Sequence, residues 1–190
     1  NKTVEFAVTV ESVQGNVKTD IPLVFTEDCE YKVTGIRANG VDGVLQANNC
    51  TVTVNGNGKV VANGGFDGED EYAMAVWATG ENAKVIINGG RYSQAVAGND
   101  SQYDMIYASN GAIIEIYGGT FESVTPSWTL NCKNNSNGKI YVMGGRYYKC
   151  NPATLQQSRN DKSCAQEIIV PIGYEVTQDG DWYVVSMKPG

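Results

Sequence analysis

The chain has 190 residues, a formal net charge of -7 and no histidine. This length suits a single domain with a substantial core, and the scattered lysines and arginines exclude a basic surface for nucleic acid or an anionic membrane. No apolar stretch is long enough for a membrane span, and the absence of histidine excludes Ser–His catalysis. The chain begins at Asn1 without a methionine, so we expect a processed protein or an excised piece.

Residues 1–18 alternate between polar and apolar side chains, which predicts an N-terminal β cap. Residues 26–35, TEDCEYKVTG, then align without a gap on residues 47–56, ANNCTVTVNG. The same phrase continues down the chain and ends each time at a marker glycine: Gly35, Gly56, Gly89, Gly118 and Gly144. Within each copy the apolar residues recur with period two, so each copy predicts a strand with one buried face.

Two further short strands flank each copy, and three strands per turn describe a parallel β-helix. We therefore predict an all-β, right-handed parallel β-helix of about five coils over residues 19–150, within one structural domain. The inward side chains are expected to include Val33, Val54, Val85, Ile87, Ile114, Ile116, Ile140 and Val142.

An aromatic residue follows the glycine pair in three copies, at Tyr92, Phe121 and Tyr147. An interior stack that fills the core of the solenoid is favoured over an exposed aromatic strip for sugars. The five cysteines show no C-x-x-C spacing, and buried thiols are favoured over one disulfide; Cys29 would stack on Cys50.

Residues 151–190 predict a polar connector followed by a C-terminal hairpin cap. The connector covers residues 151–166, and the hairpin turns at Asp179-Gly180 between β-rich flanks. Such a cap would cover the last open strand edge.

The copies differ most at the corner between the third strand of one coil and the first strand of the next. Because coils stack, these loops gather acidic and aromatic residues along one edge: Asp67, Glu69, Asp70, Glu71, Asp100, Tyr103, Asp104, Glu122 and Trp128. Three interpretations stay open. The edge is a solvated acidic surface, a calcium site at Asp67, Glu69 and Asp70, or a glycan groove with two carboxylates as acid and base. No other cofactor is expected.

The phrases INGGRYS, IYGGTFES and TLNCKNNSNGKIYVMGGRYYKCNPA, followed by GYEVTQDGDWYVV, resemble a family of right-handed parallel β-helix proteins of the pectin-lyase-like class. Phages and prophages of gut bacteria encode that family, and the likeness covers roughly residues 45–186. The resemblance implies a virion structural or fibre-like role, often trimeric, and it supplies no catalytic motif.

The leading hypothesis is thus a non-enzymatic structural and recognition module of an extracellular particle, such as a phage fibre, spike or decoration protein. A polysaccharide lyase or glycoside hydrolase at the acidic edge is the alternative, and a bacterial surface adhesin is the third. The expected partners are other copies of the chain, other virion or surface proteins and a cell-surface glycan. A homo-oligomer, with a trimer favoured, would use an exposed aromatic patch: Tyr117, Tyr141, Tyr148 and Trp128.

Overall fold

A computed structural model of the protein describes residues 45–62, 74–94, 104–155 and 167–190 in full, and the backbone of four short strands that precede them. Strands dominate the described residues, which also include the 3-10 turn η2 (Pro126–Trp128). None of the described helices is long and apolar enough to span a membrane.

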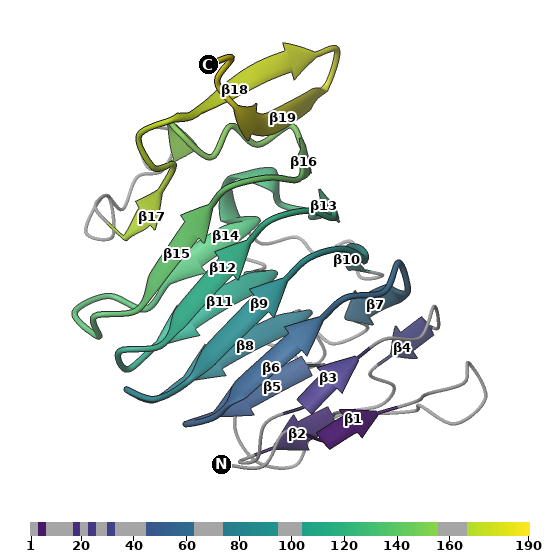
Figure 1. The fold of residues 1–190 in the computed structure, drawn as a ribbon, viewed down its shortest axis with the longest axis vertical. Helices are drawn as coiled ribbons and strands as arrows, with labels where there is room; N and C mark the ends of the chain where they lie inside the picture. The colour runs from purple at the N-terminus through teal and green to yellow at the C-terminus, as the bar shows by residue number, and fades with distance from the viewer. Residues whose placement is uncertain are drawn as a thin grey trace.

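The strands form three sheets that each run along one axis, so that successive coils stack on one another (Figure 1). Sheet A contains, in spatial order, β1 (Val4–Phe6), β3 (Leu23–Phe25), β6 (Thr51–Val54), β9 (Lys84–Ile87), β12 (Ile113–Ile116), β15 (Lys139–Val142) and β17 (Ile168–Ile169). Sheet B contains β4 (Glu30–Lys32), β7 (Lys59–Ala62), β10 (Arg91–Gln94), β13 (Thr120–Glu122), β16 (Arg146–Tyr148), β19 (Trp182–Met187) and β18 (Tyr174–Asp179). Sheet C contains β2 (Val17–Thr19), β5 (Leu45–Asn48), β8 (Val76–Thr79), β11 (Ile106–Ser109) and β14 (Leu130–Cys132).

The chain visits the sheets in the repeating order C, A, B, and each strand pairs in parallel with its equivalent in the next coil. The predicted all-β parallel β-solenoid is therefore confirmed. From β5 to β14 the chain completes about three turns, and β2 adds the fifth strand of sheet C.

The predicted register of the first coil is wrong. Tyr31 pairs with Val60 of sheet B and not with Val52, which instead pairs with Leu23 of sheet A. Residues 26–35 are thus not equivalent to residues 47–56, and Val33 and Cys29 lie outside the described residues. Strong period-two alternation occurs in more than one strand of a coil, so alternation alone did not identify the sheet.

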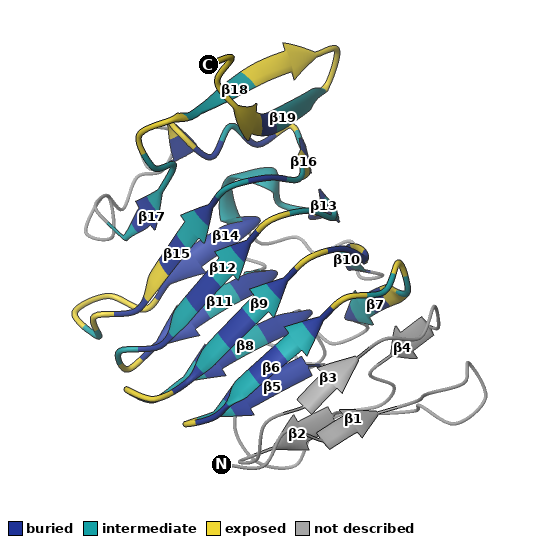
Figure 2. Cartoon of the chain, in the orientation of Figure 1, coloured by how far each residue is buried: buried dark blue, intermediate teal, exposed yellow. Residues whose placement is uncertain are grey.

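The core lies between the three sheets (Figure 2). Along β6, β9, β12 and β15 buried residues alternate with more exposed ones, as the pleat of a strand requires. All the described side chains that were predicted to point inward are buried: Val54, Val85, Ile87, Ile114, Ile116, Ile140 and Val142. Cys50, Cys132 and Cys150 are also buried, as the thiol interpretation predicts.

The predicted interior aromatic stack is confirmed. Phe121 lies between Tyr92 and Tyr147, and each pair of ring centroids is 4.9 Å apart with an interplanar angle of 7°. The two phenols donate hydrogen bonds of 2.8 Å to the carbonyl oxygens of Gly89 and Gly144. Each tyrosine is therefore fixed at both ends, by the stack and by the preceding corner.

Each glycine pair performs two separate tasks at the corner between sheets A and B. A Cβ on Gly118 would lie 2.6 Å from the Asn88 carbonyl oxygen of the previous coil. The second glycine, Gly119, has φ +110°, which side chains with a Cβ resist. The recurring pair thus allows close stacking first and a sharp turn immediately afterwards.

The C-terminal hairpin covers the last coil of sheet B. Strand β19 pairs in antiparallel orientation with β16, and Asp179 pairs with Trp182, so the two turn residues are Gly180 and Asp181. Gly180 has φ +60°, the sign that the first position of a primed two-residue turn requires. The predicted hairpin is present, with its turn one residue later than the sequence indicated.

Candidate functional site

A cleft of about 500 Å³ lies where β10, β13 and β16 end. Its walls carry hydroxyl, amide, aromatic, apolar and charged groups: Ser93, Gln94, Glu122, Ser123, Val124, Pro126, Tyr148 and Lys149. The three strands are neighbours in sheet B, so residues far apart in the chain meet here. Concave sites with a few polar groups are the usual places where small molecules and sugars bind.

The pleat of sheet B determines which of these side chains face the cleft. Ser93 and Glu122 are register partners on β10 and β13, and Tyr148 follows on β16. Their neighbours Tyr92, Phe121 and Tyr147 point inward into the aromatic stack. Because the stack fixes the inward residues, it also fixes the positions of the outward ones.

Gln94 organises the floor of the cleft. The residue is 8% exposed, and its Oε1 accepts hydrogen bonds from Ser123 Oγ at 2.8 Å and from the backbone N–H of Val124 at 2.9 Å. These bonds attach the segment after β13 to the end of β10. The shape of the cleft therefore depends on one buried carboxamide.

Asp104 extends this network away from the cleft. Its carbonyl oxygen accepts a 3.4 Å hydrogen bond from Gln94 Nε2, and its Oδ1 accepts one of 3.0 Å from Asn131 Nδ2. The Asp104 carboxylate is thus engaged with sheet C, while its backbone carbonyl contacts Gln94; Asp104 itself does not line the cleft.

Tyr148 is the aromatic wall of the cleft. Its ring meets the Trp182 ring edge-on, with centroids 5.3 Å apart, and Lys149 Nζ lies 5.2 Å from its centroid. Lys149 has φ +48°, a strained conformation for a residue with a side chain, and its N–H donates to the Asp181 carbonyl oxygen at 2.7 Å. The C-terminal hairpin therefore supports both Tyr148 and Lys149.

The described walls of the cleft carry one acidic and one basic side chain. Glu122 is exposed and is the single carboxylate among the described residues that line the cleft. Glycoside hydrolysis ordinarily uses two carboxylates that face each other across the bond. The described walls supply an aromatic ring, amide and hydroxyl groups, and one charge of each sign.

The structure brings together only part of the predicted acidic edge. Glu122 lines the cleft, Asp104 lies behind it, and Trp128 is half-buried in η2. The other predicted edge and calcium residues lie outside the described residues: Asp67, Glu69, Asp70, Glu71, Asp100 and Tyr103. Within the described part of the chain, no group of three or more acidic or cysteine residues is arranged to hold a metal ion.

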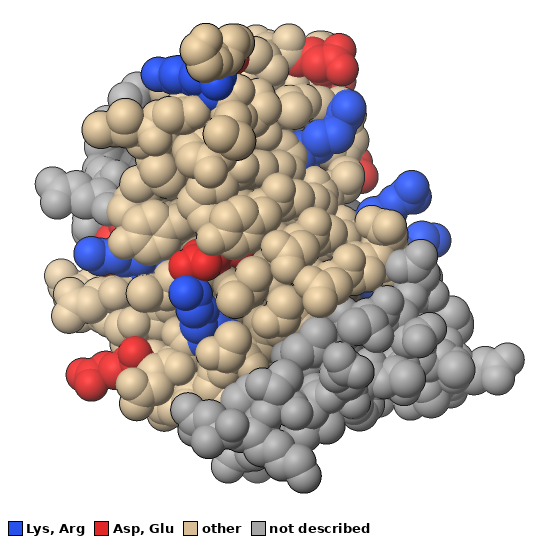
Figure 3. Space-filling model, viewed as in Figure 1, with Lys and Arg blue, Asp and Glu red and all other residues tan. Residues whose placement is uncertain are grey.

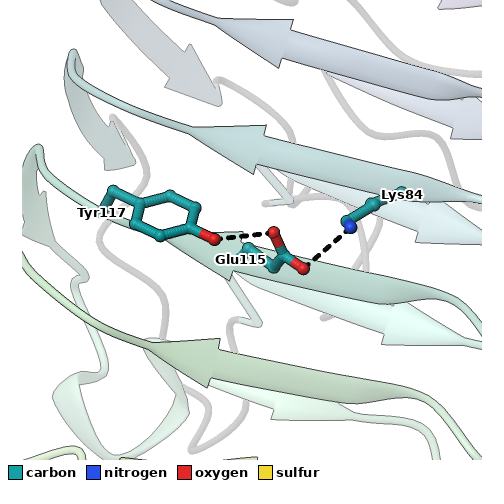
Figure 4. Close-up of polar contacts among 3 residues, drawn as sticks. All are labelled: Lys84, Glu115 and Tyr117. Carbon is teal, nitrogen blue, oxygen red and sulfur yellow. Dashed lines mark hydrogen bonds and ion pairs between the residues drawn. The ribbon is translucent and has the colours of Figure 1, made fainter.

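The predicted aromatic patch is divided between two sheets. Tyr117 and Tyr141 lie at sheet A, whereas Tyr148 belongs to sheet B and lines the cleft. On the outer face of sheet A, Tyr117 Oη donates to Glu115 at 2.9 Å, and Lys84 forms an ion pair with Glu115 at 2.9 Å (Figure 4). The hydrogen bond to Glu115 raises the pKa of the Tyr117 phenol, with smaller contributions from burial and nearby charge.

Sequence reasoning missed Gln94, Ser93 and Lys149 as cleft residues. Gln94 could have been identified from the sequence, because it is a polar residue at an inward position of a strand, where the alternation predicts an apolar side chain. Ser93 and Lys149 carry no such signal, since their roles depend on which loops meet at the end of sheet B.

The chain matches no protein-family model, no curated protein and no solved structure.

Proposed function

We propose that the protein is a non-enzymatic structural and recognition module that binds a surface glycan in the cleft at the ends of β10, β13 and β16. The observation that carries this proposal is the combination, in one cleft of about 500 Å³, of the Tyr148 ring with amide and hydroxyl groups. Aromatic rings pack against the apolar faces of sugars, while amides and hydroxyls hydrogen-bond their edges.

A rigid scaffold supports this role. Ser93, Glu122 and Tyr148 are outward neighbours of the Tyr92–Phe121–Tyr147 stack, and Gln94 connects the loop after β13 to β10. A site that is already formed loses little conformational entropy when a ligand binds.

The setting we propose is an extracellular particle or surface, most specifically a phage fibre, spike or decoration protein. Its motivation is the resemblance of the glycine-pair phrases to virion β-helix proteins, together with the stacked-coil architecture. In that setting the partners are other copies of the chain, neighbouring virion or surface proteins, and a glycan of the host cell.

The test is a panel of bacterial surface polysaccharides, incubated with the protein with and without calcium. Binding is measured by biolayer interferometry and cleavage by product chromatography. We expect binding without cleavage, at least about tenfold weaker in a Tyr148→Ala variant because a ring–sugar contact is lost. Tyr107→Ala is the matched control, since it removes a half-buried tyrosine from sheet C that does not line the cleft and should leave binding unchanged.

The outcomes separate the candidate functions. Absence of binding across the panel would contradict the proposal. Cleavage products that vanish in a Glu122→Gln variant would instead identify a polysaccharide lyase or glycoside hydrolase that uses the cleft carboxylate. Binding that depends on calcium would favour the interpretation of the acidic loops as a calcium site.

A further inference from the structure

A column of polar side chains crosses the outer face of sheet B beside the cleft. Arg91, Thr120 and Arg146 occupy the same register position on β10, β13 and β16. Both arginines are exposed and Thr120 is half-buried between them. The next residue of each strand points inward and belongs to the aromatic stack, whose ring centroids are 4.9 Å apart. The side chains of the column are therefore held at regular intervals on the outer face.

The two guanidinium groups are available to a ligand. Arg91 forms no ion pair with any of the described residues. Arg146 lies 3.9 Å from Asp179 Oδ2, but this pair is highly exposed and so contributes little, and the guanidinium also lies 5.4 Å from the Trp182 ring centroid. In Figure 3 several cationic side chains lie along the right side of the molecule, which is the side of β10, β13 and β16 in Figure 1, and others lie at the top, left and centre.

This arrangement is unusual for a chain with a net charge of -7, in which acidic residues outnumber basic ones. The described cleft adds Lys149 and only one carboxylate, Glu122. Arginine keeps its charge at every physiological pH and matches carboxylate geometry with two parallel hydrogen bonds. The column therefore favours an anion with oxygen acceptors.

We infer that the glycan bound in the cleft is an acidic polysaccharide, with one carboxylate held above Thr120 between Arg91 and Arg146. Two strand steps separate the arginines by roughly 9 to 10 Å at the backbone, so a group above Thr120 is within reach of both side chains. The adjacent sugar ring then lies against Tyr148, beside Lys149. This inference rests on the proposed function and specifies the class of glycan.

A polysaccharide is favoured over the other common polyanion, nucleic acid. The cleft presents hydroxyl and amide groups at the ring of Tyr148, which suits the hydroxyl-rich edges of a sugar. Lys59, the register partner of Arg91 on β7, brings the described cations of this face to four, which on a chain with a net charge of -7 is still too little positive charge for the counterion-driven binding that a duplex requires.

The experiment compares each binding polysaccharide from the panel before and after chemical reduction of its carboxylates to alcohols. The protein variants are Arg91→Gln/Arg146→Gln and a charge-matched control, Lys133→Gln/Lys188→Gln, whose lysines are exposed outside the column. Circular dichroism and thermal unfolding verify that both variants fold, and a 20-base-pair DNA duplex is measured alongside.

We expect the binders to be acidic, reduction to abolish binding, and the arginine variant to bind at least about tenfold more weakly while the control is unchanged. Equal binding of the reduced polysaccharide, or equal affinity of the two variants, would overturn the acidic-glycan inference and leave the proposed glycan cleft standing. Equally tight, arginine-dependent binding of the DNA duplex would overturn the choice of a polysaccharide. Absence of any glycan binding would overturn both proposals together.

Discussion

The ring of Phe121 stacks on the ring of Tyr92, with centroids 4.9 Å apart and planes 7° apart. Both side chains are almost completely buried, and their strands pair in exact register, Tyr92 opposite Phe121. The interior contact thus matches the spacing that parallel strand pairing gives two coils, and the alternating pleat places Ser93 and Glu122 outward at the cleft.

Replacing Phe121 with alanine should strongly destabilise the solenoid. The substitution removes a fully buried ring that contacts aromatic residues on both sides, so we expect a loss of about 3 to 5 kcal/mol in the free energy of unfolding. Phe121→Tyr is the matched control, because tyrosine already occupies the equivalent position in the neighbouring coils. Urea unfolding measures both. A loss below about 1 kcal/mol for the alanine variant would mean that the stack is not the organising element.

The two buried tyrosines predict instability at high pH. Burial raises the pKa of the Tyr92 and Tyr147 phenols well above their usual range, so both remain protonated in the folded protein. In the unfolded chain they lose their protons near pH 10. Keeping these phenols protonated therefore costs nothing below about pH 10. Above about pH 10 the free energy of unfolding should fall by about 1.4 kcal/mol per pH unit for each tyrosine.

Unfolding in urea between pH 9 and 11.5 checks this slope. A Tyr92→Phe/Tyr147→Phe variant should be less stable near neutral pH, because two buried hydrogen bonds to glycine carbonyls are lost. Above about pH 10 the free energy of unfolding of this variant should nevertheless fall less steeply than that of the natural chain, by about 2.7 kcal/mol per pH unit. Parallel curves would show that these phenols do not govern alkaline unfolding.

The first glycine of each corner pair should be harder to replace than a glycine in open space. A Cβ on Gly118 meets the backbone of Asn88, which cannot rotate away, so Gly118→Ala should cost at least about 2 kcal/mol. Gly173→Ala is the comparison, since its Cβ would meet nothing within 4 Å and only its φ of +97° is unfavourable. Thermal unfolding of both variants distinguishes close packing from backbone conformation. Equal costs would contradict the packing role of Gly118.

The sequence predicted the repeating part of the fold because repetition is itself a physical signal. The aligned runs around Ile87, Ile116 and Val142 revealed both the buried face and the stacking of coils. Toward the N-terminus the glycine pairs are absent, and the alternation around Tyr31 fitted two strands equally well. The register was therefore assigned one strand away from where the backbone places it.

The site was less predictable because it combines the ends of three repeating strands with the variable loops that follow them. Variation between copies drew attention to the segment that contains Glu122, and in the structure Glu122 lines the cleft. Tyr148 was instead assigned to an aromatic patch with Tyr117, since the outward direction of a residue does not reveal which sheet it belongs to. The anchoring role of Gln94 depends on a partner that is 29 residues away in the chain.

Gln94 should control the shape of the cleft. Gln94→Ala removes the acceptor for the Ser123 hydroxyl and the Val124 N–H, so we expect a loss of about 1 to 3 kcal/mol in the free energy of unfolding. Faster hydrogen exchange should be confined to the segment after β13. Ser93→Ala is the matched control in the same cleft and should change stability by less than about 0.5 kcal/mol. Unchanged exchange at Val124 in the Gln94 variant would contradict the anchoring role.

The outer face of sheet A should mediate self-association. Figure 3 shows a broad uncharged surface there, with one acidic and one basic side chain in contact near its middle. The Lys84–Glu115 pair neutralises its own charge, and Tyr117 is 47% exposed beside it, so a second copy meets little net charge on this face of an otherwise acidic chain.

We expect light scattering across a concentration series to show a homo-oligomer, with a trimer favoured by the resemblance to spikes. Tyr117→Lys/Tyr141→Lys should shift the chain to monomer, because each new charge would be buried at the contact. Tyr148→Lys is the control, since it places the same charge on sheet B and should leave the oligomer intact. A natural chain that stays monomeric at micromolar concentration would show that Tyr117 and Tyr141 are solvated and that the contacts between copies lie elsewhere. Dissociation by the Tyr148 variant alone would place the interface at the cleft, where it would compete with the glycan.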